Sequence, residues 1–376
     1  MTPALEELIP EFIRGLPVYI PGKPIEEVER ELNIHAIKLA SNENPLGPSP
    51  MAMEAVRAAL AESHRYPDGG TCRLREKLAE RHGVKQEEIF VGLGSSELID
   101  LAARILLTRG LTGLTSEGSY APFSIAIRAN GANLRLVPLR EFTFDLISMA
   151  EALTPHTHVV YLANPNNPTG TAFGNDELEE FLGRVADDVL VVLDEAYIHY
   201  ADRADMPRSL EIFRERKNLL ILRTFSKVYG LAGLRLGYGI GQAGIVAAMN
   251  KLRTPFNVTG LSQAAAIAAL DDEEHVRRSI ETNRTERKRL CAELSALGLR
   301  PVPSHTNFIF MEMGPEASAI TDELLREGVI VRPLGWMGFP EAVRVSVGTA
   351  EENEKFLAAM DRVWTKRAGK SELTTR

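Results

Sequence analysis

The sequence predicts an α/β protein with a mostly parallel central sheet, a second and smaller α+β unit, and an N-terminal arm. Two observations support this prediction. From about residue 50, helix-period segments alternate with short β-rich runs, the order expected of crossover units. After residue 257, long helix-period segments are followed by two separate β-rich runs. We therefore divide the 376 residues into an arm with part of the small domain at 1–40, a large domain at 41–257 and a C-terminal small domain at 258–376.

The first 40 residues are rich in proline, with Pro3, Pro10, Pro17, Pro21 and Pro24. Proline interrupts helices and restricts the residue before it to extended conformations. We therefore expect an extended arm that carries one helix, at about 24–32, and that packs on another part of the protein.

The predicted central sheet contains β-rich runs at 89–92, 114–116, 158–162, 189–193 and 219–223. The run at 189–193, Val-Leu-Val-Val-Leu, has no polar alternation, which indicates a strand that is covered on both faces. A helix at 96–107 places apolar side chains such as Leu98 and Leu101 along one stripe. In the small domain we expect helices at 262–269 and 274–297 and strands at 307–313 and 342–347.

Composition and charge exclude several classes of function. A net charge of −8 disfavours electrostatic binding of nucleic acid over a broad surface. The longest apolar run, at 264–270, is seven residues, whereas a membrane-spanning helix needs about 20. The chain opens without a charged and then apolar leader, and its two cysteines are far apart, as is typical of the reducing cytoplasm. The histidines are scattered, so we expect no metal site.

Four polar segments directly follow predicted strands, at the edge where open α/β sheets place their ligands. The first is Gly-Leu-Gly-Ser-Ser at 92–96. It is either a tight turn with Ser95 as a helix cap, or a phosphate site at the start of a helix. The second is the turn-forming run Asn-Pro-Asn-Asn-Pro-Thr-Gly at 164–170, which by itself indicates only a loop.

The other two segments carry charge. Asp194 ends the most apolar strand, where a buried carboxylate needs a cationic partner or a helix to cap. Lys227 follows the strand at 219–223. It is either a surface lysine or a desolvated amine of lowered pKa, which reacts with carbonyl groups.

Taken together, these segments match the needs of a pyridine aldehyde cofactor, pyridoxal 5'-phosphate. Lys227 would form the Schiff base, and Asp194 would pair with the ring nitrogen. The remaining groups are Asn167 and Tyr197 for the phenolic oxygen, Ser95, Ser96, Ser226 and Arg235 for the phosphate, and Tyr120 to stack on the ring.

Several runs resemble those of the fold-type I aminotransferases, over nearly the whole chain. They are SNENPLGP at 41–48, RYPDGG at 65–70, NPNNPTG at 164–170, DEAY at 194–197, TFSKVYGLAGLRLGY at 224–238 and RVSVGT at 344–349. Within that superfamily, the residues of these runs and the order of the runs resemble those of the histidinol-phosphate aminotransferases.

The resemblance implies a homodimer with a shared active site. It assigns Tyr66 to the cofactor phosphate of the neighbouring subunit, Arg344 to the substrate carboxylate and Asn44 to the substrate. Arg332 is either an exposed strand-end residue or the partner of the substrate's own phosphate. Tyr19 on the arm either closes the pocket or simply packs.

The implied reaction transfers an amino group between glutamate and a phosphorylated keto compound, giving 2-oxoglutarate and histidinol phosphate. An aromatic amino-acid aminotransferase would carry the same cofactor motifs and stays an alternative. A dinucleotide-dependent oxidoreductase is more remote. Residues 239–244 formally match GxGxxG, but the expected acidic residue about 20 positions on is missing.

Overall fold

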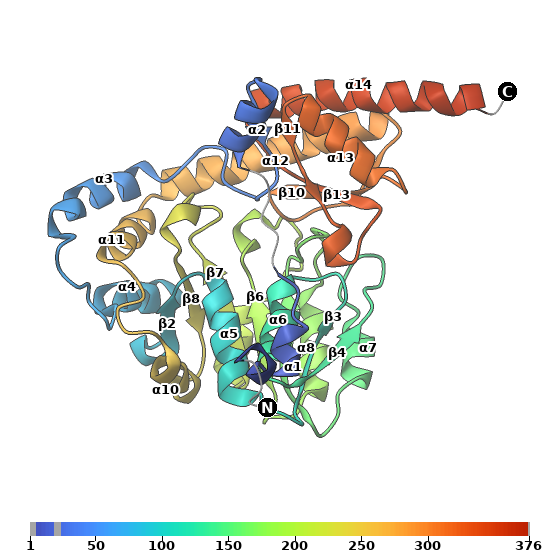
Figure 1. Ribbon diagram of the computed structural model, residues 1–376. Helices are drawn as coiled ribbons and strands as arrows, with labels where there is room; N and C mark the ends of the chain where they lie inside the picture. Colours follow the sequence, from blue (N-terminus) through green and yellow to red (C-terminus); the bar gives the residue numbers. More distant parts are fainter. Residues whose placement is uncertain (1–4, 19–23, 375–376) are drawn as a thin grey trace.

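The large unit is built on a seven-stranded sheet (Figure 1). The computed structural model describes residues 5–18 and 24–374. The strands lie in the order β2-β8-β7-β6-β5-β3-β4, and every pair from β7 to β4 is parallel. The strands are β2 (Ile89–Gly92), β3 (Thr112–Ser116), β4 (Asn133–Val137), β5 (Thr157–Ala163), β6 (Leu190–Asp194), β7 (Leu219–Thr224) and β8 (Gly237–Ile240). The predicted α/β class with a mostly parallel sheet is confirmed.

Two of these strands were not predicted, for different reasons. β4 is an edge strand with partly exposed polar residues, so its pattern is weak. β8 contains two glycines, and a Cβ at Gly239 would lie 2.8 Å from Leu98.

Because β8 runs antiparallel to β7, its carboxyl end lies at the opposite edge of the sheet. The GxGxxG match at 239–244 is therefore remote from the carboxyl ends of the parallel strands.

Helices bury the sheet. α5 (Ser95–Leu106) packs against strands in the middle of the sheet through the buried side chains Leu98 and Leu101, as its apolar stripe predicts. The other helices of this unit are α3 (Pro50–Ala59), α4 (Cys72–His82), α6 (Ala121–Ala129), α7 (Leu146–Glu151), α8 (Asn175–Arg184), α9 (Ser209–Glu215), α10 (Ala243–Leu252) and α11 (Gly260–Ala269). None of the helices within 5–18 and 24–374 is long and apolar enough to cross a membrane.

A smaller unit lies above the large sheet in Figure 1 and has its own core. Its antiparallel sheet has the order β12-β13-β10-β9, and a second, two-stranded sheet pairs β1 with β11. The strands are β1 (Ile37–Lys38), β9 (Arg300–Pro301), β10 (Phe308–Glu312), β11 (Val329–Ile330), β12 (Arg332–Pro333) and β13 (Ala342–Ser346). The helices are α12 (Glu273–Ala296), α13 (Ala317–Arg326) and α14 (Ala350–Thr374).

The arm joins both units. α1 (Glu11–Arg14) contacts α6 of the large unit, whereas α2 (Ile25–Leu32) and β1 belong to the small one. α11 packs on α3, and its Ala265 and Ala266 are part of the large core. We therefore propose that the second domain boundary, predicted at 258, lies near the start of α12.

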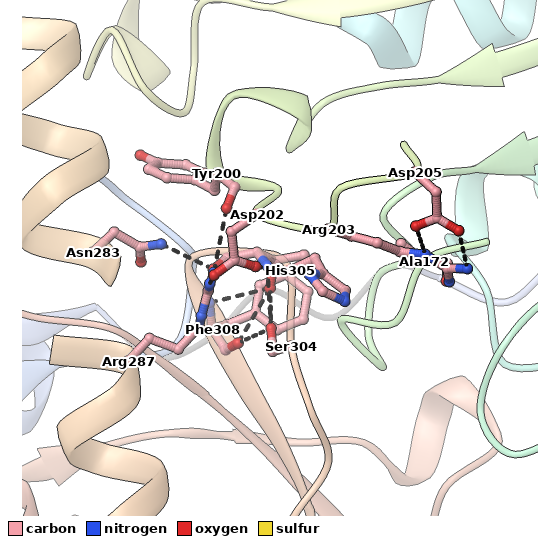
Figure 2. A network of polar contacts seen from close by, with 11 residues as sticks. Ala172, Tyr200, Asp202, Arg203, Asp205, Asn283, Arg287, Ser304, His305 and Phe308 are labelled. Atoms are coloured by element: carbon pink, nitrogen blue, oxygen red, sulfur yellow. Dashed lines mark hydrogen bonds and ion pairs between the residues drawn. The ribbon is translucent and has the colours of Figure 1, made fainter. Parts of the chain in front are cut away.

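A buried polar network ties the small unit to the large one (Figure 2). Arg287 on α12 is 4% exposed and donates to Asp202 Oδ2 at 2.6 Å and to the Thr306 carbonyl at 2.7 Å. His305 Nδ1 lies 2.9 Å from Asp202 Oδ1. Burial raises the pKa of Asp202, but the hydrogen bond from His305 and the charge of Arg287 outweigh it, so the net pKa lies below its usual value.

Asp202→Ala is expected to lower the free energy of unfolding by about 3–5 kcal/mol, because it leaves a buried guanidinium without its counter-ion. Asp205→Ala is the control, since the Arg203–Asp205 pair in the same view is exposed to solvent and its loss should change the free energy of unfolding little. The stabilisation by Asp202 is present at neutral pH and is lost as the pH falls through its lowered pKa. Urea unfolding at pH 7 and at pH 3 measures the free energy of unfolding of both variants and its dependence on pH. Equal losses of free energy in the two variants at pH 7 would contradict the role of Asp202 as the counter-ion of Arg287.

Candidate active site

The carboxyl ends of the parallel strands open into a cavity of about 410 Å³. Its walls come from the ends of β5, β6 and β7, the start of α5, the segment at 40–43 and strands β12 and β13. Among the residues that line it are Ser95, Ser96, Tyr120, Asn167, Asp194, Tyr197, Ser226, Lys227, Arg235, Arg332 and Arg344.

Lys227 lies in the loop after β7. Its Nζ donates to the carbonyl of Asn42 at 3.2 Å and to that of Ser41 at 3.5 Å, and it lies 5.4 Å from the centre of the Tyr197 ring. Burial, together with the positive charge of Arg344, lowers the pKa of the Lys227 amine to about 8. Near physiological pH this lysine is therefore neutral far more often than an ordinary lysine, and the neutral amine is the nucleophile.

Asp194 is the last residue of β6 and is 4% exposed. Its Oδ1 accepts a hydrogen bond from the Ala196 N–H at 3.0 Å. Burial raises the pKa of its carboxyl group to about 7, even though this hydrogen bond acts in the opposite direction. A cation in the cavity would favour the ionised carboxylate.

One end of the cavity is suited to a phosphate. Ser95 and Ser96 are the first residues of α5, where backbone N–H groups and the helix dipole attract anions. Gly94 has a φ of 80°, and a Cβ there would lie 3.2 Å from the guanidinium of Arg235. The tight glycine turn therefore lets Arg235 approach the start of the helix, so two sources of positive potential meet at one point.

Two further polar groups that line the cavity have defined orientations. Asn167 Oδ1 accepts from Arg344 Nη1 at 2.6 Å, so the amide oxygen of Asn167 faces the guanidinium. The Tyr197 hydroxyl accepts from Asn42 Nδ2 at 3.0 Å. The Asn167 amide and the Tyr197 hydroxyl can both donate to an oxygen bound in the cavity.

Arg332 and Arg344 are direct cross-strand partners on β12 and β13, and each is 7% exposed. The Arg332 guanidinium lies 4.9 Å from the Trp336 ring centre, and Arg344 Nη2 donates to the Ala40 carbonyl at 2.7 Å. Two guanidinium groups placed side by side on the wall of one cavity favour a ligand with one dianion or two carboxylates.

This donor set fits pyridoxal 5'-phosphate, because an amine, a carboxylate, a phosphate cup and two donors for an oxygen surround one space. It does not resemble a metal site. Within the described residues, no group of three or more His, Cys, Asp or Glu side chains is placed to hold a metal ion.

Residues 34–360 match the family model of the class I and II aminotransferases. Histidinol-phosphate aminotransferase 2 of Pseudomonas fluorescens Pf-5 is 48% identical over 93% of this chain and 96% of that protein. A Pseudomonas aeruginosa protein of the same name is equally similar, with the same coverage. The chain belongs to the histidinol-phosphate aminotransferase family. The crystal structure of histidinol-phosphate aminotransferase from Sinorhizobium meliloti in complex with pyridoxal 5'-phosphate superposes with a TM-score of 0.87, at 31% identity over 95% of this chain and 97% of that one.

The structure thus brings most of the predicted residues of this aminotransferase to one cavity, but not all of them. Tyr66 lies outside its lining, is 84% exposed and stacks on Phe256 at 4.8 Å between ring centres. Asn44 also lies outside: its Nδ2 donates to the Val228 carbonyl at 2.9 Å and to Ser279 Oγ at 2.8 Å. Its bond to Val228 holds the loop after Lys227, and its predicted contact with substrate stays a prediction. Tyr19 lies outside the described residues.

Sequence reasoning missed Asn42, which lines the cavity. It belongs to the run SNENPLGP, and nothing in that run distinguishes it from Asn44. The structure distinguishes it by its backbone conformation, because Asn42 has a φ of 55°. Asparagine is the non-glycine residue that most readily adopts this left-handed region.

Proposed function

We propose that this aminotransferase binds pyridoxal 5'-phosphate in the cavity and transfers an amino group between glutamate and imidazole acetol phosphate, giving 2-oxoglutarate and histidinol phosphate. The observation that carries this proposal is that the Lys227 amine and the Asp194 carboxylate line the same cavity, from the ends of two adjacent parallel strands. The chain's similarity to the family supports it. A cytoplasmic location is part of the proposal.

In this proposal each wall of the cavity has one role. Lys227 would bind the aldehyde, Asp194 would pair with the ring nitrogen, and Asn167 and Tyr197 would donate to the phenolic oxygen. Ser95, Ser96, Ser226 and Arg235 would hold the phosphate at the start of α5, and Tyr120 would stack on the ring. The bound cofactor supplies an electron sink for the carbanion that forms when the substrate loses its α-proton.

Lys227 also moves the proton. An amine with a pKa of about 8 is close to neutrality, where a group can both accept and return a proton during one cycle. The amine would take the α-proton from the substrate and deliver it to the cofactor carbon. Burial and the positive charge of Arg344 keep this pKa low, so binding of an anionic substrate to Arg344 would raise the basicity of the lysine.

The paired arginines define the substrate class. Histidinol phosphate has a phosphate and no carboxylate, whereas glutamate has two carboxylates, so one pocket must accept both kinds of anion. Arg332 and Arg344 are neighbours on adjacent strands and can serve the phosphate in one half-reaction and the carboxylates in the other.

Steady-state kinetics with alternative amino donors tests the substrate. We expect a larger kcat/KM with histidinol phosphate than with phenylalanine. Arg332→Met should lower kcat/KM for histidinol phosphate by about 10- to 100-fold, the effect of losing about 1.5–3 kcal/mol of charged hydrogen bonding. Arg326→Met, an exposed arginine on α13, is the matched control. If phenylalanine is the better donor, the proposed substrate is wrong and the protein is an aromatic amino-acid aminotransferase.

We further propose that the enzyme is a homodimer with a shared active site. Tyr66, Phe256 and Leu93 are exposed by 84%, 47% and 38%. Phe256 has a φ of 54°, a strained conformation for a bulky residue, and it stacks on Tyr66. The patch adjoins the phosphate end of the cavity, because Glu97 on α5 bonds to both Asn257 and the Leu93 N–H. Tyr66 would then reach the cofactor phosphate of the neighbouring subunit.

Phe256→Asp is expected to convert the dimer into a folded, inactive monomer, because the change affects an exposed side chain and places a charge in the interface. Light scattering coupled to gel filtration measures the mass, and Ile147→Asp on α7, 49% exposed, is the control. A Phe256→Asp protein that stays dimeric, or a wild-type enzyme that is active as a monomer, would refute this interface.

A further inference from the structure

Asn42 lies where the lysine, the phenol and the substrate-binding strand meet. Its side chain is 1% exposed, and its backbone is in the left-handed region, at a φ of 55°. For residues other than glycine this conformation is costly and persists where surrounding contacts fix it. Contacts of both its backbone and its side chain hold Asn42 in this conformation.

The backbone carbonyl of Asn42 accepts two hydrogen bonds. One comes from Lys227 Nζ at 3.2 Å and the other from Asn307 Nδ2 at 3.0 Å. A carbonyl oxygen has two lone pairs, so both acceptor positions are used. When the Lys227 amine leaves, Asn307 still satisfies this buried acceptor. Movement of the lysine therefore does not create an unpaired buried carbonyl, which would be costly.

The side chain of Asn42 has one defined orientation. The Ser346 hydroxyl donates to Asn42 Oδ1 at 3.1 Å and accepts from the Asn42 N–H at 2.8 Å. The amide oxygen is thereby directed to β13, and the NH₂ group donates to the Tyr197 hydroxyl at 3.0 Å. Ser346 lies two residues after Arg344 on the same strand.

We propose that Asn42 is a positioning residue for amino transfer. Its carbonyl holds the Lys227 amine whenever that amine is not bonded to the cofactor, and its side-chain amide orients the Tyr197 phenol. This inference rests on the proposed function and deepens it. Because the Tyr197 oxygen accepts from Asn42, the Tyr197 O–H is a stronger donor to the phenolic oxygen of the cofactor. The backbone carbonyl of Asn42 thus acts on Lys227 and its side-chain amide acts on Tyr197, and the two effects can be tested separately.

Asn42→Gly removes the amide and keeps the backbone, because glycine adopts a positive φ without strain. The weakened Tyr197 donor stabilises negative charge on the phenolic oxygen of the cofactor less well. The bound cofactor therefore loses its proton at higher pH. We expect the pH midpoint of the visible absorption band of the holoenzyme to rise by about half a unit or more. Asn33→Gly is the matched control, since Asn33 also has a positive φ, 52°, but is exposed at the end of α2.

Asn307→Leu removes the donor that holds the Asn42 carbonyl and leaves the amide contact with Tyr197. We expect kcat to fall by about tenfold with both KM values within about twofold, and the pH midpoint to stay at its wild-type value. A purely structural role for Asn42 would lower the melting temperature of both variants and leave the midpoint and the ratio of kcat to KM unchanged.

The proposal is overturned if Asn42→Gly titrates like the wild type, or if folded Asn307→Leu retains its kcat. Should Asn307→Leu fail to fold, the Asn42→Gly titration alone decides. The wild-type holoenzyme is measured first: if it shows no visible band and no amino transfer, the proposed function itself fails, before any variant is compared.

Discussion

Lys227→Ala is expected to lower kcat/KM by about 10,000-fold or more, because one side chain supplies both the covalent attachment and the proton transfer. The visible absorption band of the holoenzyme should disappear at the same time. The fold should be retained, since the lysine contributes only two hydrogen bonds, to the carbonyls of Ser41 and Asn42.

Lys251→Ala, an exposed lysine on α10, is the matched control and should behave like the wild type in both measurements. Steady-state kinetics and absorption spectra of the reconstituted proteins provide the comparison. A Lys227→Ala enzyme that keeps its visible band would show that another amine holds the cofactor.

Asp194→Asn should have opposite effects on activity and on the stability of the cofactor-free protein. It removes the counter-charge of the ring nitrogen, and we expect kcat to fall by about 100-fold or more. Yet the carboxylate is buried, and burial raises its pKa from about 4 in the unfolded chain to about 7 in the folded one. Between these two values the folded state binds more protons than the unfolded state, so the cofactor-free wild type loses stability as the pH rises from 4 to 7.

The asparagine variant has no such titration. Above pH 7 the cofactor-free variant should therefore be more stable than the cofactor-free wild type, by at most about 4 kcal/mol. Saturating pyridoxal 5'-phosphate should reverse the order, because the protonated ring stabilises only the wild-type carboxylate. Urea unfolding between pH 4 and pH 8, with and without cofactor, tests this; parallel pH profiles for the two cofactor-free proteins would disprove the raised pKa.

Much of the large unit follows from its pattern. The strand at 189–193 lacks polar alternation because β6 lies in the middle of the sheet and is covered on both faces. The rule that ligands bind at the carboxyl ends of parallel strands was sufficient to group Asp194, Lys227 and the start of α5 from the sequence alone. The residues that line the cavity were predictable because their positions depend on the strands that carry them.

The missed features depend on contacts between distant segments. Asn42 bonds to Tyr197, Asn307 and Ser346, which are between 155 and 304 positions away in the chain. No local pattern records those contacts. The short edge strand β4 and the glycine-containing β8 have weak patterns. The packing of α11 on α3 depends on tertiary contacts that its alanine-rich sequence does not reveal. The exposed position of Tyr66 is consistent with a role that needs a second subunit.

Borohydride reduction of the holoenzyme, followed by peptide mass mapping, tests the central claim most directly. Reduction fixes the cofactor on the amine that binds it. We predict a single modified peptide, with the added mass on Lys227. Modification of another lysine, such as Lys38 beside Glu43, or an unmodified Lys227 in a protein that is fully loaded with cofactor, would contradict the account.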